Sequence, residues 1–166
     1  MFQSSMIALA LLLTPQDQSA PPAYAMPGEE AVDPYTVDPA NAGATPFSGD
    51  GMARSFGGQD GIHRIVDRFV ALNFADQRIG EIFVNHDQVR LKRTLFEQFC
   101  YILNAGCTYT GRDMRSSHKD MGVQQGDMNR LVENLQAAMA AERVPFAVQN
   151  RFLAKLAPMR RDVVER

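Results

Sequence analysis

The sequence contains no run of about 18 consecutive apolar residues, the length that a membrane-spanning helix requires, so a spanning helix is not expected. It also lacks positive charge at its start, because residues 1–50 contain no Lys or Arg. The remaining residues have only a mild excess of basic over acidic side chains. Nucleic-acid-binding proteins concentrate positive charge on one face, so we expect no nucleic-acid partner.

Cysteine is scarce: Cys100 and Cys107 are the only two, and their spacing fits no zinc site. Two interpretations stay open. In an exported protein the two thiols pair and close a short loop at the end of a helix. In a cytoplasmic protein Cys100 is simply a small buried apolar residue.

The first 25 residues resemble an export signal. Residues 6–13 are apolar, and Ala23–Tyr24–Ala25 has the small-x-small pattern of a cleavage site. We therefore expect a signal peptide at 1–25 and a periplasmic or secreted protein. No basic residue precedes the apolar run, which favours the alternative that translation begins at Met26 or Met52 and the protein stays in the cytoplasm.

Residues 26–50 are rich in Pro, Ala, Gly and acidic side chains and show no sustained periodicity. Such a composition buries too little apolar surface to fold, so we expect a disordered linker here. The folded domain is expected at 51–166.

In that domain no segment alternates with period two, so no strand is expected. Apolar residues recur instead at helical spacing, which predicts four long helices near residues 57–73, 87–105, 125–139 and 145–159. Asp87 is suited to cap the second helix, and Pro145 to the first turn of the fourth. The fold class is therefore all-α.

Between the second and third helices lies a short segment with a histidine in an unusual setting. Thr110 and Asp113 have capping-box spacing, which predicts a short helix from Gly111 to Gly122. On it Met114, His118 and Met121 share one face, so an imidazole lies among soft apolar side chains. This is the environment of a porphyrin-bound iron ligand, although the spacing by itself favours an ordinary core histidine.

The run YTGRDMRSSHKDMGV, residues 109–123, resembles the F-helix region of group I truncated haemoglobins. The resemblance extends through most of residues 56–164 and includes the paired glycines at 57–58, VDRF at 66–69, RLK at 90–92 and LAPMRRDVV at 156–164. It implies a truncated (two-over-two) globin fold that holds haem b, with His118 as the proximal iron ligand.

The resemblance also implies that Phe83 packs against the haem and that Leu91 and Leu95 face its distal side. With the apolar faces of the predicted helices, the residues expected to surround the cofactor are Phe69, Val70, Phe83, Leu91, Leu95, Phe99, Met114, His118, Met128 and Leu131. Only His118 is expected to bind the metal. Lys92, Arg93 and Arg112 are candidates for pairing with the haem propionates.

The sequence departs from its family on the distal side. Many members have a tyrosine and a glutamine that donate hydrogen bonds to the bound gas, where this chain has Val70 and Leu95. Loss of such a donor costs about 1–3 kcal/mol, so we predict an apolar distal pocket and weak preference for oxygen. Thr94 and Gln98 are the remaining polar candidates. With no second strong ligand in view, we expect five-coordinate ferrous haem.

The resemblance implies binding of oxygen, nitric oxide or carbon monoxide, for transport, storage or sensing, with an unidentified reductant as partner. A haem enzyme is the alternative, either a nitric oxide dioxygenase or a peroxidase-like catalyst. Peroxidase chemistry normally needs a distal acid–base side chain, and no matching His or Arg is found. A third alternative is a haem-free helical module that uses the pocket for other contacts.

Overall fold

The computed structural model describes residues 26–165, and the predicted signal peptide at 1–25 lies outside them. All regular elements in the described range are helical, which confirms the all-α prediction. The elements are η1 (Pro39–Ala42), α1 (Gly51–Ser55), α2 (Gly58–Ala75), η2 (Gly80–Ile82), α3 (Gln88–Ile102), α4 (Met114–His118), α5 (Gln125–Ala141), α6 (Phe146–Leu156), η3 (Ala157–Met159) and α7 (Arg160–Val163).

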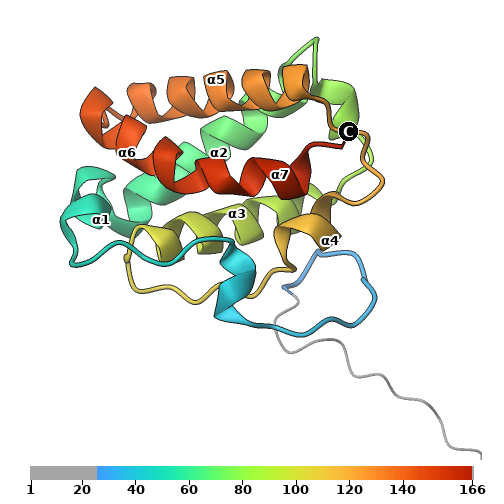
Figure 1. The fold of residues 1–166 in the computed structure, drawn as a ribbon, viewed down its shortest axis with the longest axis horizontal. Coiled ribbons are helices and arrows are strands. Elements are labelled where there is room, and N and C mark those ends of the chain that lie inside the picture. Colours follow the sequence, from blue (N-terminus) through green and yellow to red (C-terminus); the bar gives the residue numbers. More distant parts are fainter. Residues whose placement is uncertain (1–25, 166) are drawn as a thin grey trace, which may run out of the picture.

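Helix α2 lies at the centre of the fold and packs against both α5 and α3 (Figure 1). Its buried residues repeat at helical spacing and meet apolar side chains of α3, α5 and α6 in one core. Phe152 of α6 joins these layers, because its ring packs edge-on against Phe56 at 5.1 Å and Phe99 at 5.0 Å. The predicted periodicity therefore corresponds to one contiguous core.

A polar contact fixes the far end of α2 against α5. The buried Asn134 amide donates to the Asn73 side chain over 2.9 Å, and Arg130 pairs with Asp76 at the end of α2. Buried amides need such partners, because an unpaired one costs free energy. These contacts hold the point where the chain leaves α2 for the segment containing Phe83.

The helix boundaries largely follow their local signals. Asp87 caps α3 by accepting hydrogen bonds from the backbone N–H groups of Val89 and Arg90, as predicted. The short helix is where the prediction was wrong. It begins at Met114, with Asp113 as its N-cap, rather than near Gly111. Thr110 does not cap it, because its hydroxyl is directed to α3, where it donates to the Glu97 carboxylate over 2.7 Å and accepts from Arg93 over 2.6 Å.

The segment expected to be a disordered linker is ordered and lies against the helices. We call residues 26–42 the N-terminal strap; in Figure 1 it passes below α4 and α3. The Asn41 amide donates to the Gly111 carbonyl over 3.2 Å, and Gln98 of α3 donates to the Ala42 carbonyl over 2.9 Å. The composition of this segment predicted that its acidic side chains face solvent, as Glu30, Asp33 and Asp38 do. Glu29 differs, because Arg90 and Arg93 of α3 lie opposite its carboxylate.

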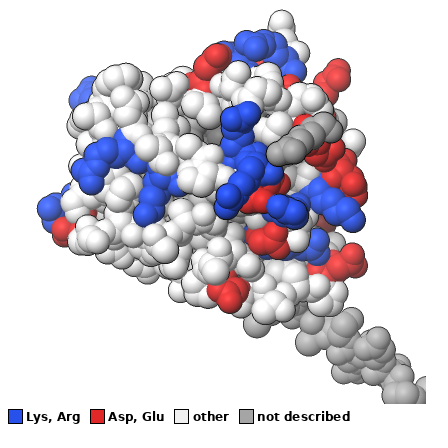
Figure 2. All heavy atoms as spheres, in the orientation of Figure 1, with Lys and Arg blue, Asp and Glu red and all other residues white. Residues whose placement is uncertain are grey.

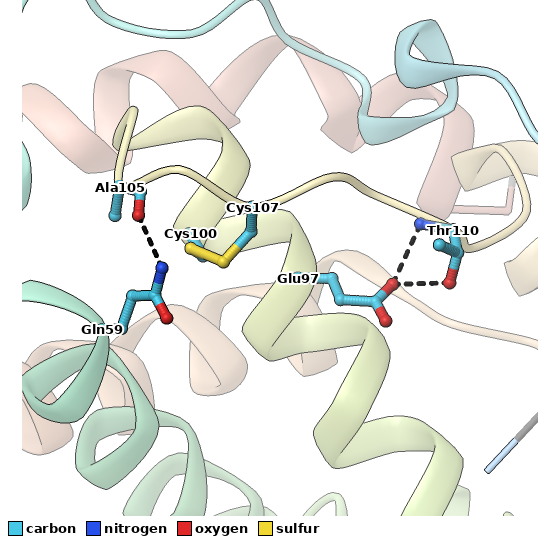
Figure 3. The surroundings of a disulfide bond; sticks show 6 residues. All are labelled: Gln59, Glu97, Cys100, Ala105, Cys107 and Thr110. Atoms are coloured by element: carbon cyan, nitrogen blue, oxygen red, sulfur yellow. Dashed lines mark hydrogen bonds between the residues drawn. A yellow bond between two sulfur atoms is a disulfide. The ribbon is translucent and has the colours of Figure 1, made fainter. Parts of the chain in front are cut away.

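Cys100 at the end of α3 is bonded to Cys107, so the two thiols pair and close a short loop. Figure 3 shows that the same loop is held on both sides of the disulfide. Gln59 donates to the Ala105 carbonyl over 2.8 Å, and Glu97 accepts from the Thr110 N–H over 2.9 Å. The loop that leads to α4 is therefore held by α2 at Gln59 and by α3 at Cys100 and Glu97.

Candidate functional site

A cavity of about 850 Å³ lies between α3, α4, α5 and the C-terminal helices. This volume is within the range of roughly 300–1,000 Å³ that is typical of cofactor sites. Most of the predicted site residues line it: Phe83, Leu91, Leu95, Met114, His118, Met128 and Leu131. The remaining ones, Phe69, Val70 and Phe99, are buried in the core behind its wall rather than on its surface.

Several lining residues were missed by the sequence interpretation. They are apolar residues of the segment after α2 and of the C-terminal helices, including Ile79, Ile82, Leu153, Leu156 and Met159. Their periodicity marks them as core residues. Only the fold reveals that the core opens into a cavity at this point.

The imidazole of His118 is oriented by its own helix. Its Nδ1 atom lies 2.7 Å from the Met114 carbonyl oxygen, so Nδ1–H donates to that carbonyl and Nε2 keeps its lone pair. Burial lowers the pKa of His118 below its ordinary value, more than this backbone contact raises it. The ring is therefore neutral at pH 7, which is the form that binds a metal.

In the loop before α4, the buried ring of Tyr109 requires a glycine at position 111. Tyr109 is buried, and its hydroxyl donates to the Arg112 carbonyl over 2.8 Å. A Cβ atom at Gly111 would lie 2.2 Å from that hydroxyl oxygen, so only glycine fits under the ring. This packing sets the path of the chain into α4. The contact between Tyr109 and Gly111 thus helps to place His118 at the cavity.

The distal wall is apolar where α3 faces the cavity. Leu91 and Leu95 line it, and Thr94, which also lines it, donates its hydroxyl proton back to the carbonyls of Arg90 and Leu91. Gln98 donates its amide to Ala42 and otherwise contacts the sulfur atoms of Met114 and Met159. Both polar candidates are therefore engaged by the protein itself.

Three arginines line the cavity, namely Arg90, Arg112 and Arg160, and they are not the set that the sequence indicated. Arg112 is one of the predicted cations, but Lys92 pairs with Asp67 and Arg93 with Glu29 and Glu97, away from the cavity surface. The exposed Arg160 was missed, and so was the half-buried Arg90. Its position one residue before Leu91, in the RLK stretch, was the available signal. Its Nε and Nη1 atoms are buried and have no hydrogen-bond partner among residues 26–165.

These features fit haem. The described residues contain no group of three or more His, Cys, Asp or Glu side chains that could hold a bare metal ion. Haem needs less from the protein, because the porphyrin supplies four of the ligands and one imidazole completes the proximal side. An apolar cavity with one oriented imidazole accommodates the porphyrin, and buried guanidinium N–H groups without acceptors accommodate its carboxylates.

The other two histidines of the described chain are exposed. His63 stacks on Phe96 of α3, with 4.2 Å between ring centres, and His86 lies at the rim of the cavity. On the face shown in Figure 2, Lys and Arg are interspersed with Asp, Glu and uncharged surface. None of the helices within residues 26–165 is long and apolar enough to cross a membrane.

Comparison with known sequences identifies relatives over the helical domain. Residues 54–165 match the profile of the family described as bacterial-like globin. The chain is 25% identical over 107 residues to a group 1 truncated haemoglobin of Mycolicibacterium paratuberculosis, covering 64% of this chain and 79% of that protein. It is 26% identical over 108 residues to the group 1 truncated haemoglobin of Tetrahymena pyriformis, covering 65% and 89%.

Comparison with solved structures shows the same fold. The truncated haemoglobin of Tetrahymena pyriformis in its Fe(III) form superposes with a TM-score of 0.66 at 24% identity, covering 69% of this chain and 98% of that one. The 2/2 haemoglobin of a Synechococcus species, crystallised with covalently attached haem, gives a TM-score of 0.64 at 23% identity, with the same coverage. Residues 26–53, which include the N-terminal strap, lie outside the family match.

Proposed function

Because the chain belongs to the bacterial-like globin family as a group I truncated globin with haem iron as its cofactor, we propose that His118 is its proximal ligand and that a diatomic gas binds on the opposite face. The orientation of the His118 imidazole supports this assignment most directly. Its Nδ1 is held by the Met114 carbonyl, and the ring stands at an apolar cavity of about 850 Å³.

Each wall of the cavity has its own part in this function. When bound, haem supplies reversible gas binding at ferrous iron. His118 holds the metal, and the Nδ1–H donation to a carbonyl raises the basicity of the imidazole as a ligand. The apolar side chains of α3 would exclude water from the gas-binding side, which would limit side reactions there.

We further propose that the distal pocket stabilises bound oxygen weakly. Leu91 and Leu95 offer no donor, and the hydroxyl of Thr94 is bonded to its own helix. Bound oxygen carries partial negative charge and gains about 1–3 kcal/mol from a donor, whereas carbon monoxide gains less. The chain therefore binds oxygen, nitric oxide or carbon monoxide with little preference for oxygen.

Spectroscopy and rapid mixing test this function. The protein purified with haemin should show a strong Soret band, and the dithionite-reduced form should have a five-coordinate ferrous spectrum. Oxygen should dissociate rapidly in stopped-flow displacement by carbon monoxide. A six-coordinate ferrous spectrum or slow oxygen release contradicts the proposal. Stoichiometric conversion of the oxy form to nitrate by nitric oxide, with repeated turnover under a reductant, would instead support the dioxygenase.

We propose export as the location of the protein. The Cys100–Cys107 disulfide supports this, because disulfides persist in oxidising compartments and are rare in the cytoplasm. Sequencing of the mature N-terminus together with cell fractionation tests it. A mature chain that begins at Met26 and is recovered outside the cytoplasm supports export. The same N-terminus, or one at Met52, in a cytoplasmic fraction with reduced thiols contradicts it.

A further inference from the structure

The N-terminal strap forms part of the cavity wall. Glu30, Val32 and Tyr35 line the cavity together with Arg90 and Arg112. The family match begins only at residue 54, so this wall is an addition to the family fold. The strap therefore lies where it contacts any molecule that fills the cavity.

Glu29 anchors the strap to α3. Its side chain is 0% exposed, and its carboxylate accepts hydrogen bonds from Nε of Arg93 and, over 3.1 Å, from Nη2 of Arg93. The second carboxylate oxygen also lies 3.5 Å from Nη2 of Arg90. A buried carboxylate is tolerated only when it is paired, and here two arginines one turn apart on α3 supply the pairing.

The guanidinium group of Arg90 is only partly hydrogen-bonded. Its Nη2 atom donates to the Glu30 carbonyl. Its Nε atom lies 3.6 Å from the Asp87 carboxylate, which is beyond hydrogen-bond range, and Nη1 has no acceptor in the described chain. Burying guanidinium N–H groups without acceptors is unfavourable, and a carboxylate is the strongest acceptor for them. Arg90 also lines the cavity, where such a carboxylate would arrive.

We propose that Arg90 binds a haem propionate and that the N-terminal strap, through Glu29, holds Arg90 in position to do so. This inference rests on haem occupying the cavity. Arg90 is the binding residue and Glu29 a positioning residue. Arg112 and Arg160 are less suited to the role. Arg112 donates to the Asp33 carbonyl and stacks over Tyr35, with its guanidinium carbon 5.0 Å from the ring centre. Arg160 is exposed, so water already satisfies its N–H groups. The strap thus serves to retain the cofactor.

Propionate recognition by Arg90 is tested with haemin and haemin dimethyl ester, whose carboxylates are blocked. The rate of transfer of each to excess apomyoglobin is measured for the full chain and for Arg90→Met. The unmodified protein should lose the ester roughly tenfold faster than haemin, since a hydrogen bond to a charged group is removed. Arg90→Met should lose haemin roughly tenfold faster and no longer distinguish the two porphyrins.

Lys92→Met is the matched control, because Lys92 is a cation of the same helix that pairs with Asp67 and does not line the cavity. It should leave both rates unchanged. If Arg90→Met keeps the full discrimination between haemin and its ester, the proposal is wrong. Should Arg90→Met fail to fold by circular dichroism, Arg90→Lys is measured instead. It keeps the charge but not the planar donor group, and it should retain only part of the discrimination.

The positioning role of Glu29 is tested by a double-mutant cycle. Glu29→Gln should accelerate haemin loss several-fold in the unmodified protein and have no further effect in the Arg90→Met background. Asp33→Asn is the control, because Asp33 contacts the domain through its backbone carbonyl and not its carboxylate. Additive effects of Glu29→Gln and Arg90→Met overturn the proposal. A chain that shows no Soret band with haemin refutes the function itself, whereas normal haemin binding with unaltered rates refutes only this inference.

Discussion

The inner wall and the mouth of the cavity are held by different forces. The inner wall consists of apolar side chains from α3, α4 and α5 around His118. The mouth is held by hydrogen bonds and ion pairs between the N-terminal strap and α3, such as those of Glu29 with Arg93. Apolar burial is non-directional and independent of pH, whereas charge pairs require ionised partners and weaken in salt. The two regions should therefore respond differently to mutation and to solution conditions.

The largest expected effect is at the inner wall. His118→Gly should abolish stable haem binding, because no other described residue of the inner wall offers an imidazole. The Soret band is the measurement, and imidazole added in solution should partly restore it. His86→Gly is the matched control, since His86 is the other histidine that lines the cavity, at its exposed rim. Equal loss of haem in both variants would contradict the assignment of His118.

The next effect concerns the disulfide that joins the end of α3 to the loop before α4. Replacing Cys100 and Cys107 together by alanine should lower the free energy of unfolding by about 2–3 kcal/mol, because the short loop is no longer closed in the unfolded chain. Urea denaturation measures this difference. Addition of a thiol reductant should bring the unmodified protein to the stability of the variant and leave the variant unchanged. A variant as stable as the disulfide-bonded protein would contradict this account.

A smaller effect is expected when the apolar character of the inner wall is broken. Leu95→Gln places a donor on the distal wall and should slow oxygen dissociation about tenfold to a hundredfold. Leu95→Met is the control, since it keeps the size of the side chain and adds no donor. The ratio of oxygen to carbon monoxide affinity should rise only in the glutamine variant. Unchanged kinetics would mean that position 95 does not face the bound gas.

The smallest effect is at the mouth and depends on pH. Burial acts to raise the pKa of the Asp87 carboxyl, but N–H donors of Arg90, Glu30 and Val89 hold it below its ordinary value of 3.8. The contact between Asp87 and the strap therefore stabilises the folded state above pH 3.8 and is lost as the pH falls through the lowered pKa.

The backbone amide resonance of Glu30 reports this titration, because its N–H donates to the Asp87 carboxylate over 2.8 Å. Its midpoint should lie below 3.8, and resonances of inner-wall residues such as Leu95 should not follow it. Asp87→Asn keeps an oxygen that can cap α3 and removes the charge, so the Glu30 titration should disappear. A midpoint at or above 3.8 would show that the strap does not stabilise the charged carboxyl.

The inner wall was largely predictable from the sequence. Apolar residues at helical spacing identified α2, α3, α5 and α6, and Asp87 marked the start of α3. Leu91, Leu95, Met128 and Leu131 line one cavity because they lie on the faces that α3 and α5 turn inward. Phe83 and the role of His118 were instead implied by the resemblance to the family. Periodicity did not separate Val70 and Phe69, which are core residues, from Leu91 and Leu95, which line the cavity. Both kinds of position have the same spacing.

The mouth could not be predicted in this way. Its contacts join residues far apart in sequence, as in the pair Glu29 and Arg93, which are 64 residues apart. No local pattern encodes such a pair, and an acidic, proline-rich segment has the composition of a disordered linker until its partners are known. The predicted start of α4 was wrong because of a similar contact: the Thr110 hydroxyl is bound to Glu97 of α3 and does not cap α4.

The way in which the strap is held has a consequence for assembly. None of residues 26–42 belongs to the apolar core that joins α2, α3, α5 and α6. Segments with few buried apolar contacts detach at the lowest free energy, so we expect the helices to associate while residues 26–42 are still detached. The cavity is then open during the interval in which the porphyrin enters. Closure follows as the final step, and departure of the porphyrin must reverse it.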